Sequence, residues 1–217
     1  LKKLLKSKKM LTNVGDEGGF APSIKSNEEA LSLIVDAIEL SKLIPGKDVS
    51  ICLDVAANEL INKDGNYSIK TNSFMSVEDT IKYYKKLLSD YPIKSIEDPF
   101  AEEDWDSWKK INSEVGSNIQ IVGDDLFVTN VKRLNKGINE NCANSILVKP
   151  NQIGSLTETL KVINLAKKNN YKTIISHRSG DSEDTFIADL AVSTNSPQIK
   201  TGSLARSERV AKYNRLL

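Results

Sequence analysis

Six short apolar runs, each ending in a charged or imidazole residue, constrain the fold more than any other feature. They occupy residues 51–54, 93–97, 119–124, 145–149, 173–177 and 198–200. Their last residues are Asp54, Glu97, Asp124, Lys149, His177 and Lys200, separated in turn by 43, 27, 25, 28 and 23 positions. A strand of about 5 residues, a helix of about 11 and two short loops fill a comparable length. The spacing therefore predicts an α/β fold with parallel strands.

Right-handed crossovers allow such a sheet to curl into a (β/α)8 barrel of the TIM type. The C-terminal ends of barrel strands meet at one rim, where barrel enzymes carry their active sites. With 217 residues the chain is somewhat short for a complete barrel, which typically needs ~250. The chain begins without Met in a helical pattern and stops without a helix-ending signal. We therefore expect residues 1–217 to form one partial barrel domain of a longer protein.

Composition excludes several classes of function. Lys and Arg number 30 against 29 Asp and Glu, so the net charge of +1 offers no general attraction to nucleic acid or membranes. Leucines interrupt the basic residues 2–9 at helical spacing, which is typical of a solvated helix face. No apolar run reaches ~18 residues, and there is no secretory leader pattern. Cys52 and Cys142 are expected to be free thiols, and the protein to be soluble and cytosolic.

Helix signals separate the apolar runs. Ser26 and Ser76 each stand three residues before an acid, Glu29 and Asp79, in the pattern of a capping box. Further helices are expected over residues 105–114, 131–140, 155–168, 183–193 and 203–213. Residues 60–73, with a turn signal at 63–66, predict a small hairpin inserted between the first two runs.

Acids at three of the strand ends indicate a metal site. Side chains alternate between the two faces of a strand, and this alternation directs Cys52 and Asp54 to the barrel interior. It also favours Glu97 over Asp98 as the inward acid. It does not decide between Asp124 and its neighbour Asp125. Three inward carboxylates require compensating charge, which a hard cation such as Mg²⁺ supplies. The alternative is that these acids only pair with lysines.

Two lysines, Lys149 and Lys200, are predicted to lie opposite these acids. An unperturbed lysine has a pKa of ~10.4 and is a poor base at pH 7, but nearby positive charge lowers this pKa. One of the two lysines is therefore a candidate general base. A purely structural role as ion-pair partner remains the alternative.

Two loops complete the candidate site. His177, Arg178 and Ser179 follow an apolar strand, and a guanidinium fork with a hydroxyl is suited to binding a phosphate or carboxylate. Residues 15–19 form an acidic loop in which glycines flank Asp16 and Glu17, so that the backbone can approach a ligand. Taken alone, this second loop is equally consistent with a simple turn.

Taken together, these segments resemble the enolase family. The matching stretches are residues 14–22, 95–100, 123–126, 149–154, 176–180, 183–185 and 198–202, in family order across nearly the whole chain. The resemblance implies the C-terminal portion of an enolase-type (β/α)8 barrel. It also implies Mg²⁺-dependent dehydration of 2-phospho-D-glycerate to phosphoenolpyruvate in glycolysis, by a cytosolic protein that is a homodimer when full length.

The resemblance also assigns roles to single residues. Asp54, Glu97 and Asp124 match the Mg²⁺ ligands, Lys149 the base that removes the C2 proton and contacts substrate, and Glu17 the acid that helps the C3 hydroxyl leave. Arg178 and Ser179 match phosphate contacts, Lys200 a group near the substrate carboxylate, and His177 a neighbour of the substrate. A Lys or His base that works with one or two Mg²⁺ ions is a known property of the enolase superfamily.

Departures from the family pattern are modest. Asn58 stands where Ser is usual before Glu59, and Pro150 follows the presumed base where Val is frequent. The family's N-terminal domain, the first barrel elements and the loops that close over substrate have no counterpart in these residues, so the segment alone is expected to be inactive. The rival interpretations are a superfamily racemase or cycloisomerase acting on a non-phosphorylated acid, and a fragment with only a binding role.

Overall fold

The computed structural model describes residues 1–70 and 73–217. Its main feature is a six-stranded parallel sheet in the order β1-β4-β5-β6-β7-β8. The strands are β1 (Ile51–Asp54), β4 (Ile93–Glu97), β5 (Gln120–Gly123), β6 (Ser145–Val148), β7 (Lys172–Ser176) and β8 (Gln198–Lys200). Each strand coincides with one of the six predicted runs to within one residue at either end. The predicted α/β class is therefore confirmed.

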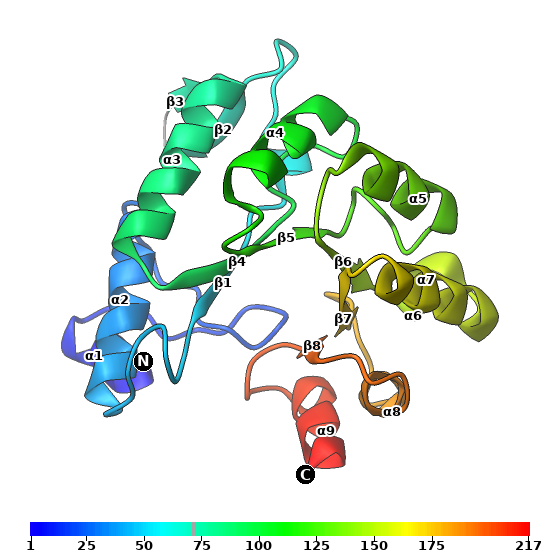
Figure 1. Cartoon of the computed structure of the whole chain (residues 1–217). Coiled ribbons are helices and arrows are strands. Elements are labelled where there is room, and N and C mark those ends of the chain that lie inside the picture. The colour runs from blue at the N-terminus through cyan, green and yellow to red at the C-terminus, as the bar shows by residue number, and fades with distance from the viewer. Residues whose placement is uncertain (71–72) are drawn as a thin grey trace.

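Helices lie outside the strands and follow them in an arc (Figure 1). They are α1 (Lys2–Ser7), α2 (Asn27–Leu40), α3 (Val77–Asp90), α4 (Trp105–Val115), α5 (Val131–Glu140), α6 (Pro150–Ile153), α7 (Leu156–Lys168), α8 (Phe186–Ser193) and α9 (Ser207–Leu216), with a 3₁₀ turn at Ala57–Glu59. A small antiparallel pair, β2 (Tyr67–Lys70) and β3 (Ser73–Met75), lies between β1 and α3. The hairpin predicted around the turn at 63–66 is present only as one antiparallel bridge between Ile61 and Tyr67. The pairing of β2 with β3 was not predicted, and residues 71–72 lie outside the described residues.

Contacts between distant strands show that the sheet is curled. The side-chain amides of Gln120 on β5 and Gln198 on β8 exchange hydrogen bonds of 2.9 and 3.0 Å. These strands are three spacings apart in the sheet order, which would be about 14 Å in a flat sheet. Lys200 on one edge strand likewise contacts Asp54 on the other. The sheet is therefore a partial barrel of six strands, as predicted.

The hydrophobic core fills the space between the strands and the helices. Strand residues Ile96, Ile121 and Ile146 are fully buried there. Phe127 needs the two glycines beside it, because a Cβ at Gly137 would lie 2.4 Å from its ring and one at Gly123 would lie 2.5 Å away. The alternation that places apolar side chains against the helices leaves the intervening side chains facing the barrel interior.

Serine caps start two helices as predicted. Ser26 and Ser76 each accept a backbone N–H at 3.2 Å, from Glu29 and Asp79 respectively. A capping box also has a second hydrogen bond, from the backbone N–H of the serine to the acid. For Ser26 this part of the prediction is wrong, because the Glu29 carboxylate accepts the backbone N–H of Lys25 at 2.6 Å and not that of Ser26.

Two predicted helices start later than the sequence pattern indicated. The helix expected from residue 183 begins at Phe186, whose amide is accepted by the Asp184 carboxylate at 2.8 Å. The helix expected over 203–213 is α9, which begins at Ser207 because the preceding residues bind the loop at 15–19. The short helix α6 was not predicted; Pro150 fits its first turn, where no backbone N–H is needed.

Within residues 1–70 and 73–217, none of the helices combines the length and the apolar character needed to cross a membrane. Cys52 is exposed, Cys142 is buried, and both are free thiols, as predicted.

The pairing of Gln120 with Gln198 provides a test of the curled geometry. We expect Gln120→Ala and Gln198→Ala to be non-additive, with a coupling energy of about 0.5–3 kcal/mol, because either single variant leaves the other amide without its partner. Urea unfolding of the purified wild type, both single variants and the double variant would measure it. Additive effects on the free energy of unfolding would contradict the contact across the interior.

Candidate functional site

The charged strand ends gather at one rim of the partial barrel. Asp54 and Glu97 are register partners on β1 and β4, and Ser176 pairs in the same way with Lys200 at the ends of β7 and β8. Because the strands are parallel, all six predicted strand-end residues lie at the same end of the sheet. The rim is therefore built by the topology, which brings together side chains up to 146 positions apart in sequence.

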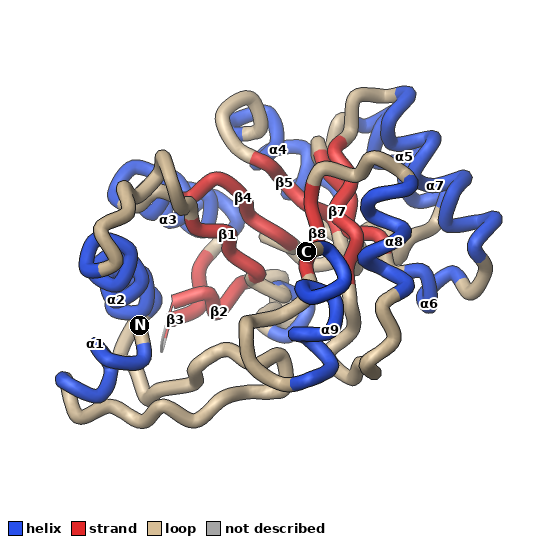
Figure 2. Tube along the Cα trace, turned by 90° about the horizontal axis from the view of Figure 1, so that it is seen from below, coloured by secondary structure: helices blue, strands red, loops and turns tan. Residues whose placement is uncertain are grey.

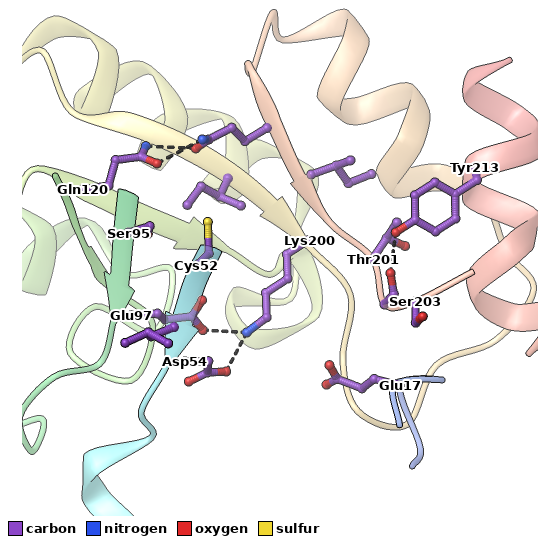
Figure 3. A pocket seen from close by; sticks show the side chains of 16 residues that line it. Glu17, Cys52, Asp54, Ser95, Glu97, Gln120, Lys200, Thr201, Ser203 and Tyr213 are labelled. Carbon is purple, nitrogen blue, oxygen red and sulfur yellow. Dashed lines mark hydrogen bonds and ion pairs between the residues drawn. The ribbon is translucent and has the colours of Figure 1, made fainter. Parts of the chain in front are cut away.

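Lys200 joins the two edges of this rim (Figure 3). Its Nζ lies 2.6 Å from Asp54 Oδ2 and 2.8 Å from Glu97 Oε1. Burial raises the pKa of Glu97 to about 7, and the Asp54 charge adds to this effect while Lys200 opposes it. Burial lowers the pKa of Lys200, but the carboxylates of Glu97 and Asp54 outweigh that effect and hold its pKa above the usual value. Lys200 in this arrangement is a stable cation.

Lys149 forms a second ion pair at the neighbouring strand ends. Its Nζ lies 2.5 Å from Asp124 Oδ2, and both side chains are nearly buried. The other oxygen of this carboxylate, Asp124 Oδ1, is buried and has no hydrogen-bond partner among the described residues. Burial also raises the pKa of Asp124, although Lys149 opposes the shift. An orphaned anionic oxygen inside a cluster of carboxylates is suited to a hard cation.

The backbone at Lys149 is fixed by a residue that sequence reasoning missed. The amide N–H of Lys149 donates to Thr129 Oγ1 at 2.9 Å, and Thr129 is fully buried. Val128 and Thr129 both have positive φ, at 42° and 53°, which β-branched residues rarely adopt. This strained turn places the hydroxyl at the start of α6, where it also donates to Gln152 Oε1 at 3.2 Å. No sequence signal distinguishes Thr129 from an ordinary buried threonine.

Asp98 and Asp125 lie close to Asp124 but are engaged elsewhere. Oxygen atoms of these three residues lie within 4.8 Å of one another, so the group could hold a cation. However, both oxygens of Asp98 accept backbone N–H groups at 2.9 Å, from Asp124 and Asp125. Asp125 accepts a hydrogen bond of 2.9 Å from Asn58. This group differs from the predicted ligand set, and its hydrogen bonds give Asp98 a structural role in holding the loop after β5.

The acidic loop at 15–19 belongs to the segment between α1 and α2, which extends to the side of α9 (Figure 2). It is a tight turn, closed by a 2.8 Å hydrogen bond from the Gly15 amide to the Gly19 carbonyl. The amide of Ser203 donates to the Glu17 carbonyl at 2.8 Å, and a Cβ at Gly18 would clash with the Ala205 carbonyl at 2.5 Å. The Glu17 carboxylate lies 3.3 Å from Nε2 of His177. The loop is therefore a docked element of the site.

Two hollows receive the predicted residues. A cavity of about 530 Å³ is lined by Glu17, Asp54, Glu97 and Lys200, with Glu17 facing Lys200 across it (Figure 3). A second, of about 440 Å³, is lined by His177 and Arg178 among others. In it, the Arg178 guanidinium donates to Asn151 Oδ1 at 3.3 Å. The side chain of Ser179 is exposed, and within the described residues no hydrogen bond joins it to Arg178.

Seven of the nine predicted residues thus meet in three groups, which are Lys200 with Asp54 and Glu97, Lys149 with Asp124, and Glu17 with His177. Arg178 and Ser179 join none of these groups. The groups are near enough for Asp124 to affect the pKa of Glu97 and for Lys200 to affect that of Asp124. Sequence reasoning missed Asn58 as a loop anchor and also the two buried cations of α9, Arg209 and Lys212. Their positions in α9 resemble those of any solvated basic residue in a polar helix.

Thr129→Val should lower the free energy of unfolding by about 1–3 kcal/mol, because it leaves the Lys149 amide buried without an acceptor. The matched control is Thr80→Val, since Thr80 is equally buried and its hydroxyl has no partner among the described residues. That control should be near neutral or stabilising. Urea titrations would compare the two variants, and equal losses would show that the Thr129 contact contributes nothing specific.

Comparison with known proteins identifies the family. The family described as "Enolase, C-terminal TIM barrel domain" matches residues 1–217. Curated relatives named Enolase are 65% identical over 217 residues in Pelagibacter ubique, 51% identical over 218 in Wolinella succinogenes and 55% identical over 218 in Helicobacter acinonychis. Each alignment covers 100% of this chain and 51%, 52% and 51% of those relatives, so the chain spans about half their length. With the whole chain matched and the partial barrel in place, the protein belongs to the enolase family.

Proposed function

We propose that the protein containing this chain dehydrates 2-phospho-D-glycerate to phosphoenolpyruvate in a Mg²⁺-dependent reaction. The observation that carries the proposal is the convergence of three carboxylates and two lysines at one rim of the barrel: Asp54, Glu97, Asp124, Lys149 and Lys200. The barrel itself matches the enolase family over the whole chain. Removal of a proton next to a carboxylate requires a base and stabilising positive charge, and this rim offers Lys149 as the candidate base, Lys200 as a fixed cation and carboxylates that could hold a metal ion.

Each residue has a defined part in the proposed reaction. Lys149 takes the proton from C2, and Glu17 delivers a proton to the C3 hydroxyl, which leaves as water. Lys200, held as a cation by its carboxylate partners, lies near the substrate carboxylate. Arg178 and Ser179 hold the phosphate, and His177 lines the site beside Glu17. The support for this division is that the two proton-transfer groups come from different elements, Lys149 from the end of β6 and Glu17 from the docked loop.

Asp54, Glu97 and Asp124 are proposed to hold Mg²⁺. The unpartnered, buried Asp124 Oδ1 supports this fit, as does the excess of carboxylates over lysines at the rim. When bound, the cation would supply positive charge for the second negative charge that develops on the substrate carboxylate. A cytosolic location and assembly into a homodimer remain predictions drawn from the family.

The activity is tested by following solvent exchange of the C2 proton of 2-phosphoglycerate by NMR, together with phosphoenolpyruvate absorbance, in the complete protein with Mg²⁺. We expect Lys149→Ala to reduce both rates about 10²–10⁴-fold, the usual loss when a placed general base is removed, while Mg²⁺ binding is retained. The control is Lys161→Ala, an exposed lysine on α7.

Exchange at the wild-type rate in Lys149→Ala would refute the assignment of the base. A wild type that leaves 2-phosphoglycerate unchanged but acts on a non-phosphorylated acid would favour the racemase or cycloisomerase alternative.

The ligand set is tested by calorimetric titration with Mg²⁺. Asp54→Asn, Glu97→Gln and Asp124→Asn should each abolish the binding isotherm, because a hard cation prefers ionised carboxylate oxygens. Asp125→Asn is the matched control and should bind normally. The reverse pattern, with binding lost in this control and kept in Asp54→Asn and Glu97→Gln, would assign the cation to the group of Asp98, Asp124 and Asp125.

A further inference from the structure

Arg209 is a buried cation that neither the sequence pattern nor the proposed reaction accounts for. It lies on α9, its side chain is 1% exposed, and the nearest carboxylate oxygen to its guanidinium in the described residues is Glu208 Oε1, 3.9 Å from Nε. Burying a guanidinium without a close counter-ion is costly unless hydrogen bonds replace its hydration. Its surroundings must therefore offer neutral acceptors.

Four such acceptors surround the two terminal nitrogens. Nη1 lies 2.7 Å from His177 Nδ1 and donates to the Arg178 carbonyl at 2.8 Å. Nη2 donates to the carbonyls of Asp16 at 3.0 Å and Ser179 at 2.6 Å. All four terminal N–H donors are thereby used, and the planar group is fixed in one orientation. It joins the loop at 15–19 to the segment after β7.

The contact with His177 determines where the imidazole proton lies. A guanidinium only donates, so Nδ1 must present its lone pair and the single proton of the neutral ring must be on Nε2. Nε2 lies 3.3 Å from the Glu17 carboxylate, but this contact lacks hydrogen-bond geometry, and the buried Nε2 has no hydrogen-bond partner among the described residues. Burial lowers the pKa of His177, and Arg209 and Lys200 add to this lowering against Glu17 and Asp181. The ring is therefore neutral, and its Nε2–H lies unbonded beside the Glu17 carboxylate.

We propose that Arg209 is a positioning residue that fixes His177 as the Nε2–H tautomer and, through the Asp16 carbonyl, sets the loop that carries Glu17. One guanidinium thus controls both the donor that faces Glu17 and the backbone that presents this carboxylate. The role of Arg209 in turnover rests on the proposed function, whereas the assignment of the His177 tautomer is independent of that function.

Lys212 provides the matched control. It lies one turn further along α9, is equally buried, and donates to Asp181 Oδ1 at 2.9 Å and to the Glu208 carbonyl at 2.7 Å. Its Nζ bonds neither His177 nor the loop at 15–19 in the described part of the chain. Replacing it should cost stability much as replacing Arg209 does, without changing the proton on His177.

The test is two-dimensional ¹H–¹⁵N NMR of histidine-labelled complete protein, with the His177 signals assigned by their loss in His177→Gln. The wild type should show protonated Nε2 and an unprotonated, hydrogen-bonded Nδ1. Arg209→Met should give a mixture of tautomers, Arg209→Lys should restore the Nδ1 acceptor signal in part, and Lys212→Met should keep the wild-type pattern. A wild-type Nδ1–H tautomer would overturn the proposal without any variant having to fold.

Kinetics separate this proposal from the proposed function. Arg209→Met should lower kcat about 10–100-fold with little change in KM, because a displaced acid misaligns proton delivery. An unaltered tautomer in folded Arg209→Met would overturn the positioning role even if the enzyme is active. Absence of wild-type activity on 2-phosphoglycerate would count against the proposed function and leave the NMR result as it stands.

Discussion

The contact of Lys200 with Asp54 and Glu97 is the interaction on which the rest of the arrangement depends. β1 and β8 are the two edges of the sheet, and no backbone ladder joins them in the described residues. Lys200 spans the interior between them with bonds of 2.6 and 2.8 Å. The pair of Gln120 and Gln198 makes a similar link at the opposite end of the strands. Polar side chains therefore hold the curvature from inside, while isoleucines on the other face of the same strands pack against the helices. Each buried charge costs free energy unless it is compensated, so the curl and the charge pairing at the rim support each other.

The second organising feature is the contact between the N-terminal loop at 15–19 and the C-terminal segment that leads into α9. Residues 15–19 would be a solvated turn by themselves, but the segment from Gly202 to Arg209 binds their carbonyl groups. Gly202 shows how tight this docking is, since a Cβ there would lie 2.8 Å from the Glu17 carbonyl. Arg206 adds a 2.9 Å bond from its Nε to the Gly15 carbonyl, 191 positions away in sequence. The stability of the Glu17 loop consequently depends on the far end of the chain, and α9 serves the site although it contributes no strand-end residue.

The sequence predicted the strands well because each combines an apolar run with a boundary that is itself chemically distinct. It predicted the rim because parallel strands must end together. It did not reveal which carboxylates would approach one another: Asp98 looks like a site residue, yet its oxygens are used by the amides of Asp124 and Asp125. Nor did it reveal Arg209 or Thr129, since burial of a polar side chain depends on contacts made by loops, and loops have no periodicity. The late starts of α8 and α9 have the same cause, because local hydrogen bonds and loop docking outweighed helix propensity.

Charge balance at the rim explains why its residues are arranged in pairs. Asp54, Glu97 and Asp124 carry three potential negative charges, and Lys149 and Lys200 supply two positive ones. Burial is the main cause of the raised pKa values of Glu97 and Asp124, and the two lysines offset it only in part. A divalent cation among these carboxylates would reverse the deficit and compete with the lysines for the same oxygens. On the proposed function, that competition matters for Lys149, because its side chain and the cation would share the Asp124 carboxylate. A general base needs a free lone pair, so Lys149 can take the substrate proton only in an arrangement in which its ion pair with Asp124 is loosened.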